Sequence, residues 1–185
     1  MLESLLTDYG YPALVLGTFF EGETIMLLGG LVAHLGYLSL GWVILAGLCG
    51  SLAGNQLWFL LGRRYGKGLV ARHPAWRNRF GVVLRRLERN SDLVMVAFPF
   101  VYGFRIVTPV AIGMSAVPYW RFLALNTIGV TAWATVIGGA GFLFGQAVEA
   151  VLGDIKRYEL ALIATVAAVG TIVWLLHFRR RRLKQ

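Results

Sequence analysis

The chain has 185 residues, of which 57% are hydrophobic and 15% are charged, and its formal net charge is +9. A soluble domain of this size carries charges on nearer a quarter of its residues and shows short amphipathic patterns. The composition therefore excludes an ordinary soluble domain. It predicts a multi-pass, all-α integral membrane protein of a bacterial inner membrane, with residues 1–185 forming a single membrane domain.

The basic residues are clustered, since half of the 18 lie between Arg63 and Arg89 and five more lie between Arg179 and Lys184. Basic residues are retained on the cytoplasmic side of a membrane, where they also meet anionic lipid headgroups. The clustering indicates membrane topology rather than a nucleic-acid partner.

The first apolar stretch, residues 13–35, is interrupted by Glu21-Gly22-Glu23. In one regular helix, two carboxylates two positions apart would point about 200° apart, and one would face lipid. The pattern therefore predicts a broken, re-entrant hairpin, whose freed backbone groups must be covered by protein or water.

The second stretch, residues 38–61, is uncharged and contains several glycines that allow close helix packing, so it predicts a full span. The following segment, residues 66–90, alternates bases with apolar residues. This alternation predicts an amphipathic helix on the cytoplasmic membrane surface.

The third apolar stretch, residues 93–117, contains Pro99, Pro109 and the lone base Arg105. Two prolines disfavour a straight helix. Basic residues flank both ends of the stretch, so both ends are predicted to be cytoplasmic. The stretch is therefore interpreted as a second re-entrant hairpin.

The C-terminal part is predicted to cross outward over residues 122–145, form an external loop over residues 146–157 and return over residues 159–178. The basic residues 179–185 then form a cytoplasmic tail. The order of elements predicts an inverted-repeat, transporter-like fold with two opposed re-entrant hairpins and about three full spans.

Three charges, Glu21, Glu23 and Arg105, lie within apolar stretches. A charge at the bilayer centre costs roughly 2.5–3.5 kcal/mol, so such groups usually face one another or a watery cavity. Burial and a like-charged neighbour favour protonation of a carboxylate, and a planar guanidinium suits a phosphate. We expect Arg105 to bind an anionic headgroup and the glutamates to couple protons. In the alternative interpretation, Arg105 only neutralises one glutamate and holds the two hairpins together.

Other polar residues at membrane depth are candidates for a supporting role. They are Asn55, Gln56, Tyr102, Thr108, Ser115 and Asn126. The amides could line the same cavity as the charges, although hydrogen bonding between helices is the stronger expectation. The hydroxyls could lie near Arg105 or satisfy a broken backbone.

The sequence gives no sign of a metal, a cofactor or an enzyme active site. The three histidines are widely separated and show no ligand spacing. The chain has no Gly-x-Ser-x-Gly motif, no Walker loop and no histidine placed to activate a nucleophile. We therefore expect a protein that is not an enzyme.

Four segments carry a family resemblance. They are FFEGETIMLLGG at 19–30, GSLAGNQLWFLLGRRYGK at 50–67, FVYGFRIVTPVAIGMSAVPYWRF at 100–122, and the later Asn126, Gly129 and Trp133. In this order and spacing they resemble the DedA family, also called the SNARE-associated or VTT-domain family, over about residues 10–145.

The resemblance implies an inner-membrane transporter that returns lipid carriers such as undecaprenyl phosphate, or moves phospholipids, and depends on proton motive force. It implies that Glu21 and Glu23 are the family's essential acids and Arg105 its second essential arginine. The chain departs from the pattern at Pro99, where many members have a first arginine, and at Asn55, where an aspartate is common. One base fewer weakens the match to a doubly charged phosphate.

The leading hypothesis is a proton-coupled translocase of an anionic lipid, either a polyprenyl phosphate or a phospholipid, which could act as a homo-oligomer. Its partners are the lipid and protons. One alternative is a proton-coupled transporter of a small ion or solute. The other is a membrane assembly factor without transport, in which the charges are structural.

Overall fold

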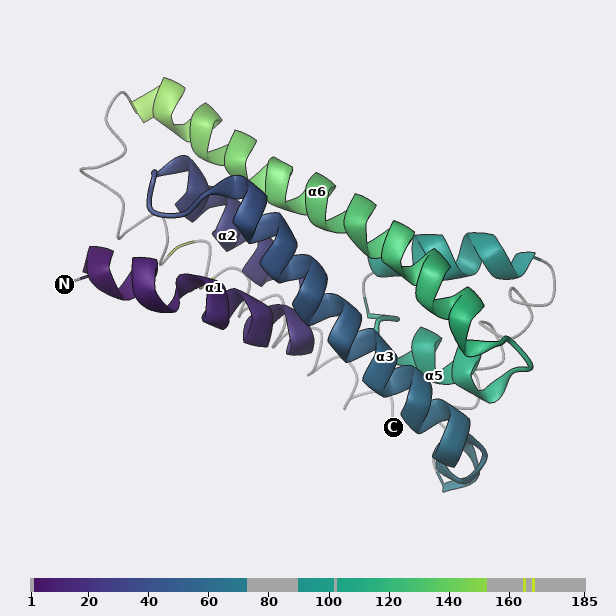
Figure 1. Ribbon diagram of the computed structural model, residues 1–185. Coiled ribbons are helices and arrows are strands. Elements are labelled where there is room, and N and C mark those ends of the chain that lie inside the picture. The colour runs from purple at the N-terminus through teal and green to yellow at the C-terminus, as the bar shows by residue number, and fades with distance from the viewer. Residues whose placement is uncertain (1, 73–89, 102, 153–164, 166–167, 169–185) are drawn as a thin grey trace. The chain divides into compact units, whose positions relative to one another are not determined.

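The computed structural model describes residues 2–72, 90–101, 103–152, 165 and 168 (Figure 1). The described residues form helices joined by turns and contain no strand, which confirms the predicted all-α class. The chain forms two compact units. Unit 1 comprises Met1–Gly47 with Ala134–Gln185, and unit 2 comprises Leu48–Trp133.

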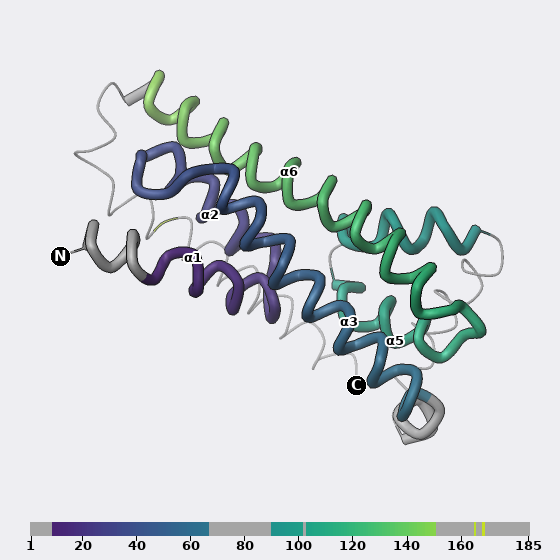
Figure 2. Tube along the Cα trace, viewed as in Figure 1, coloured from purple at the N-terminus to yellow at the C-terminus, as the bar shows by residue number. Residues whose placement is uncertain are grey.

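Unit 1 begins with α1 (Leu2–Phe20) and α2 (Glu23–His34), which are separated by Glu21 and Gly22. The chain reverses at this break, so α1 and α2 run in opposite directions (Figures 1 and 2). The sequence places the start of this element near residue 13, whereas α1 starts earlier and passes through Pro12. The first hairpin was predicted from the apolar stretch alone, and the helix continues on its N-terminal side into residues that include Glu3 and Asp8.

Glycines bring α1 and α2 together. Gly17 lies against the side chain of Ile25, and Gly29 lies against those of Leu14 and Val43. Small residues at such contacts let helix backbones approach closely, which is how helices associate where lipid removes the hydrophobic driving force. Whether this helix pair is re-entrant stays a prediction.

Two helices are long and apolar enough to cross a membrane among the residues that the structure describes. They lie in α3 (Leu40–Arg72), over Leu40–Gly66, and in α6 (Tyr119–Leu152), over Tyr119–Ala150. Both exceed the roughly 20 residues that a span requires. The basic tail lies outside the described residues, as do most of the predicted amphipathic helix and the predicted third span apart from residues 165 and 168.

The helices α3 and α6 run further than the sequence suggests. α3 continues to Arg72, into the predicted amphipathic segment. α6 continues to Leu152, so the predicted external loop over residues 146–157 is wrong for residues 146–152, which are helical. The residues from 146 to 152 are mostly good helix formers, and Glu149 among them bonds to His34.

Within unit 1, α2 packs directly on the backbone of α6. A Cβ atom at Gly30 would collide with the carbonyl oxygen of Gly138, and one at Gly141 would collide with that of Leu27. Only glycine permits this separation, because any side chain would force the helices apart.

Unit 2 contains the N-terminal part of α6, most of α3 and a broken segment between them in sequence. This segment consists of helical residues 90–97, the 3-10 helix η1 (Phe98–Phe100) and α5 (Val107–Met114). Pro99 and Pro109 both lie in the first turn of a helix, where the missing N–H is not needed. The break thus follows the prolines, while its re-entrant character stays a prediction.

An aromatic core joins the elements of unit 2. Phe59 of α3 stacks on Phe122 of α6 with ring centres 4.4 Å apart. The buried residues of this core are Phe59, Met95, Phe98, Ile112 and Phe122. α5 packs on α3 through close contacts at Gly62 and Gly113. The core therefore fixes the turn before α5, where Arg105 lies.

Candidate functional site

The two glutamates lie at the N-terminal end of α2. Glu23 is its first residue, and the Glu21 carboxylate accepts a hydrogen bond of 2.8 Å from the hydroxyl of Thr24. Both glutamates are half-buried. A helix N-terminus carries a partial positive charge that stabilises carboxylates. The break between α1 and α2 thus places both acids where the helix dipole favours them.

Arg105 lies in the turn that leads into α5. Gly103, with a φ of +80°, reverses the chain two residues before it. The amide of Phe104 donates to the carbonyl of Val101, and that of Thr108 donates to the carbonyl of Phe104. These bonds satisfy backbone groups freed by the break, as a non-helical turn at membrane depth requires.

The half-buried Arg105 side chain contacts both long helices within unit 2. Its Nη2 donates a hydrogen bond of 2.9 Å to the hydroxyl of Ser51 on α3. Its guanidinium carbon lies 5.4 Å from the ring centre of Trp133 on α6, within cation–π range. Ser51 and Trp133 are 2% and 1% exposed, so the cation is held against buried groups.

The supporting amides form a second polar contact between α3 and α6. The Asn55 Nδ2 donates a hydrogen bond of 3.1 Å to Oδ1 of Asn126, and both residues are buried. Within the described part of the chain, Asn55 Oδ1, Asn126 Nδ2, the Trp133 indole N–H and both amide atoms of Gln56 have no hydrogen-bond partner. Asn55 and Asn126 therefore join the helices, as expected of polar residues at depth.

The remaining candidates have different surroundings. Thr108 is buried in the first turn of α5. The Ser115 hydroxyl donates to the carbonyl of Ile112 and so satisfies the backbone at the end of α5. Tyr102 lies outside the described residues. No three His, Cys, Asp or Glu side chains come together as metal ligands among the residues described.

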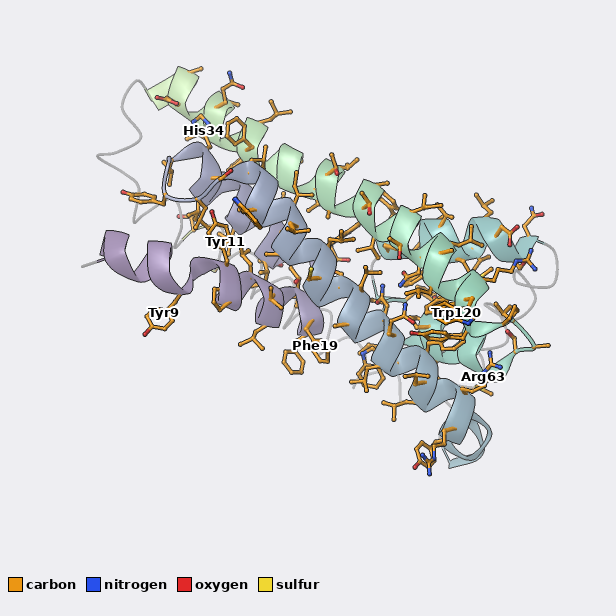
Figure 3. The ribbon with its side chains drawn as sticks, in the orientation of Figure 1. Tyr9, Tyr11, Phe19, His34, Arg63 and Trp120 are labelled. Carbon is orange, nitrogen blue, oxygen red and sulfur yellow. The ribbon has the colours of Figure 1, made fainter. Side chains whose placement is uncertain are left out.

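Two ion pairs involve other residues. In unit 1, the Nε2 atom of His34 lies 2.8 Å from a carboxylate oxygen of Glu149, and its ring faces α6 (Figure 3). In unit 2, Arg121 pairs with Asp92 at 2.8 Å. The hydrogen bond from Arg121 lowers the pKa of the Asp92 carboxyl below its ordinary value of 3.8.

The sequence matches the VTT domain over residues 20–143, about two thirds of the chain. The chain belongs to the DedA family. It is 35% identical to the inner membrane protein YohD of Escherichia coli K12, over 94% of this chain and 93% of that protein. It is 28% identical to an uncharacterized membrane protein of Synechocystis, slr0232, over 100% of this chain and 90% of that protein.

A further relative is the inner membrane protein YabI of Escherichia coli K12, which is 28% identical over 95% of this chain and 75% of that protein. No solved structure gives a significant match. The named relatives and the two membrane-length helices identify this DedA chain as a membrane protein.

In this DedA chain, the structure brings some of the predicted residues together within one unit. Arg105, Asn55 and Asn126 lie in unit 2, whereas Glu21 and Glu23 lie in unit 1. Sequence analysis missed Ser51 and did not assign a role to Trp133. A signal for Ser51 was present, because it stands one helical turn before Asn55 in an otherwise apolar run.

Proposed function

We propose that this DedA protein transports an anionic lipid or lipid carrier, either a polyprenyl phosphate or a phospholipid, across the bacterial inner membrane. It moves the lipid with proton coupling and catalyses no chemical reaction. The proposal is based on the Arg105 guanidinium, which contacts Ser51 and Trp133. In the sequence, Arg105 lies in a turn between the two helices that are long enough to cross a membrane. The C-terminus is assigned to the cytoplasm on the basis of its arginines.

The position of Arg105 supports headgroup binding. An arginine at membrane depth costs roughly 2.5–3.5 kcal/mol on insertion scales, so it marks a functional site by default. The guanidinium presents a planar set of donors that matches phosphate oxygens. Ser51 and Trp133 hold this group in one orientation, which reduces the entropy lost when a headgroup binds.

The glutamates support proton coupling. Both acids are half-buried at the N-terminus of α2, so a change in their charge alters their interaction with the helix dipole. Glu21 also holds the hydroxyl of Thr24, so a change in its charge acts on the first turn of α2. We assign the two acids to proton uptake and release, and the helices that bear them to the moving part of the transporter.

Lipid movement in proteoliposomes tests the role of Arg105. Vesicles would contain a labelled polyprenyl phosphate or a labelled phospholipid, with and without a pH gradient. Arg105→Ala should slow movement at least about tenfold, because a hydrogen bond to a charged group is worth about 1.5–3 kcal/mol. Arg121→Ala is the matched control, since that arginine is half-exposed and pairs with Asp92. Unchanged movement in the Arg105 variant would refute the role.

Charge-neutral variants separate the alternatives. If protons are coupled, Glu21→Gln and Glu23→Gln should abolish the response to the pH gradient. If the protein is an assembly factor without transport, these variants should keep its cellular function as long as they fold. Proton-driven uptake of a small solute with no movement of either lipid would favour the small-solute transporter instead.

A further inference from the structure

His34 is the last residue of α2 and packs on α6 within unit 1 (Figure 3). Its ring lies edge-on to that of Phe142, with ring centres 5.1 Å apart, and it covers the space beside Gly145. Its Nε2 atom lies 2.8 Å from a carboxylate oxygen of Glu149. The His34 side chain is 12% exposed and that of Glu149 is 57% exposed. The imidazole is therefore packed between two helices, while the surroundings can reach the pair on the Glu149 side.

This pair lies at one end of the closest helix contact in unit 1. Further along the same two helices, Gly30 lies against the backbone of Gly138 and Gly141 lies against that of Leu27. A contact this tight has discrete arrangements rather than a continuous range, because backbone atoms cannot move aside. The strength of the terminal contact between His34 and Glu149 therefore acts on how firmly the whole of α2 is held.

Protonation of the imidazole strengthens this contact. Histidine gains its charge within the range from about pH 8 to pH 5. A neutral imidazole makes a hydrogen bond to Glu149, whereas a protonated one makes a charge-assisted bond that is roughly twice as strong. The cation also lies in the last turn of α2, where the helix dipole favours positive charge. Two features of the packed state thus favour the protonated form.

Other ionisable groups of the described part of unit 1 do not compete for this role. On α6, the ionisable group that faces His34 is Glu149. The described side chains of α1 include two that can ionise, Tyr9 and Tyr11, and a tyrosine stays neutral until about pH 10. The first turn of α3 contains no ionisable side chain, and Glu23 stands about three turns away along α2. The charge state of this contact between about pH 5 and pH 8 therefore depends on His34.

The distribution of basic residues places the pair on the outer side of the membrane. No Lys or Arg precedes Arg63 in the sequence, and Arg63, Arg64 and Arg72 all lie in the C-terminal part of α3. Basic residues mark the cytoplasmic end of a span. α3 is one continuous helix, so its first residue, Leu40, lies at the opposite end, a short turn after His34.

We propose that His34 and Glu149 form a pH-sensitive latch that responds to the external medium. In external acid, protonated His34 holds the C-terminal end of α2 on α6, and the hold weakens as the external pH rises. α2 bears Glu21 and Glu23 at its other end, so the latch sets how readily the helix with these acids moves. The latch is a property of helix packing and does not depend on lipid transport.

Thermal unfolding of the full-length protein in detergent at pH 5.5 and pH 8.0 tests the latch. The ion pair requires protonated His34, so its contribution to stability is present in acid and is lost as the pH rises. Glu149→Gln keeps the size of the side chain and removes its charge. Its Tm deficit relative to wild type should be larger at pH 5.5 than at pH 8.0 by about 1–4 °C, the range for a partly exposed ion pair in a chain of this length.

Two further variants serve as controls for this measurement. Asp92→Asn should show the same Tm difference from wild type at both pH values, because the lowered pKa of Asp92 keeps its carboxyl ionised at both. His34→Phe keeps a ring beside Phe142 but cannot titrate. Adding Glu149→Gln to His34→Phe should therefore have the same effect at both pH values, and a pH-dependent effect in that background would overturn the pairing.

Hydrogen exchange shows whether the latch acts on α2. At pH 5.5, Glu149→Gln should speed exchange of the amides of residues 31–35 roughly 1.5- to 5-fold relative to wild type, with little change at pH 8.0. Exchange in α5 (Val107–Met114) should not change, whereas a general loss of stability would speed it as well. A Tm deficit that is equal at both pH values, or unchanged exchange near His34, would overturn the latch.

Cysteine labelling in intact cells tests which side of the membrane the latch faces. In a Cys49→Ser background, Glu149→Cys should react with a membrane-impermeant maleimide added outside. Arg64→Cys, at an exposed position of α3, should react only after lysis. Labelling of Glu149→Cys only after lysis would overturn the response to the external medium.

Discussion

The backbone contact between α2 and α6 predicts that two neighbouring glycines of α6 respond oppositely to alanine. A Cβ at Gly141 would collide with the carbonyl oxygen of Leu27 and lie 2.9 and 3.0 Å from its carbonyl carbon and Cα. A Cβ at Gly139 meets nothing within 4 Å. Both residues lie inside α6, so alanine gains the same helix propensity, about 1 kcal/mol, at each position.

The difference between the two variants therefore isolates the steric cost. Overpacking of a tight contact typically costs about 1–3 kcal/mol. The Gly141 collision involves backbone atoms, which cannot rotate away, so the cost should appear in full. Gly141→Ala should thus be less stable than Gly139→Ala by about 1–3 kcal/mol. For a chain of this length, this corresponds to a difference in Tm of about 2–12 °C.

Thermal unfolding in one detergent, followed by circular dichroism, measures this difference. Gly139→Ala should unfold at or above the wild-type temperature, and Gly141→Ala below it. Gly30→Ala should resemble Gly141→Ala, because its Cβ would meet the carbonyl of Gly138. Equal midpoints for the Gly139 and Gly141 variants would show that α2 does not approach α6 as closely as described.

Three further predictions concern polar pairs and use the same unfolding assay. Asn55→Ala should lower the free energy of unfolding by about 1–3 kcal/mol, because it leaves Asn126 unpaired. The double variant Asn55→Ala/Asn126→Ala should lose less stability than the sum of the two single variants, and additive losses would argue against the bond. His34→Ala should destabilise the protein by about 0.5–3 kcal/mol, because the His34 ring packs on α6. Glu149→Ala, at an exposed position, should change stability by about 0.5 kcal/mol or less. A larger loss of stability for Glu149→Ala than for His34→Ala would contradict this packing. Asp92→Asn should slightly lower stability at neutral pH, because a carboxyl whose folded-state pKa is lowered stabilises above its ordinary value of 3.8. This advantage should vanish as the pH falls through the lowered pKa, and a Tm difference that persists in acid would refute it.

Sequence reasoning succeeded where the cause is local. The scarcity of charge and the long apolar stretches determine a membrane protein built of helices, because a bilayer leaves no other partner for backbone groups in a single segment. The helix break at Glu21 and Gly22 and the interruption near Pro99 also follow residues whose preferences act over one turn. The helices α1, α3 and α6 extend beyond the apolar stretches from which they were predicted, because apolar composition marks the part of a helix that can lie in a membrane and not the ends of the helix.

Only the tertiary structure decided which polar residues meet. Arg105 bonds to Ser51 across 54 positions, Asn55 to Asn126 across 71, and His34 to Glu149 across 115. Such pairings depend on the register in which helices pack, and a slide of one turn would exchange every partner. That register is set by the core and by close glycine contacts, such as those of Gly62 and Gly113 between α3 and α5. The sequence thus determined which groups must be satisfied inside the membrane, and helix packing determined what satisfies them.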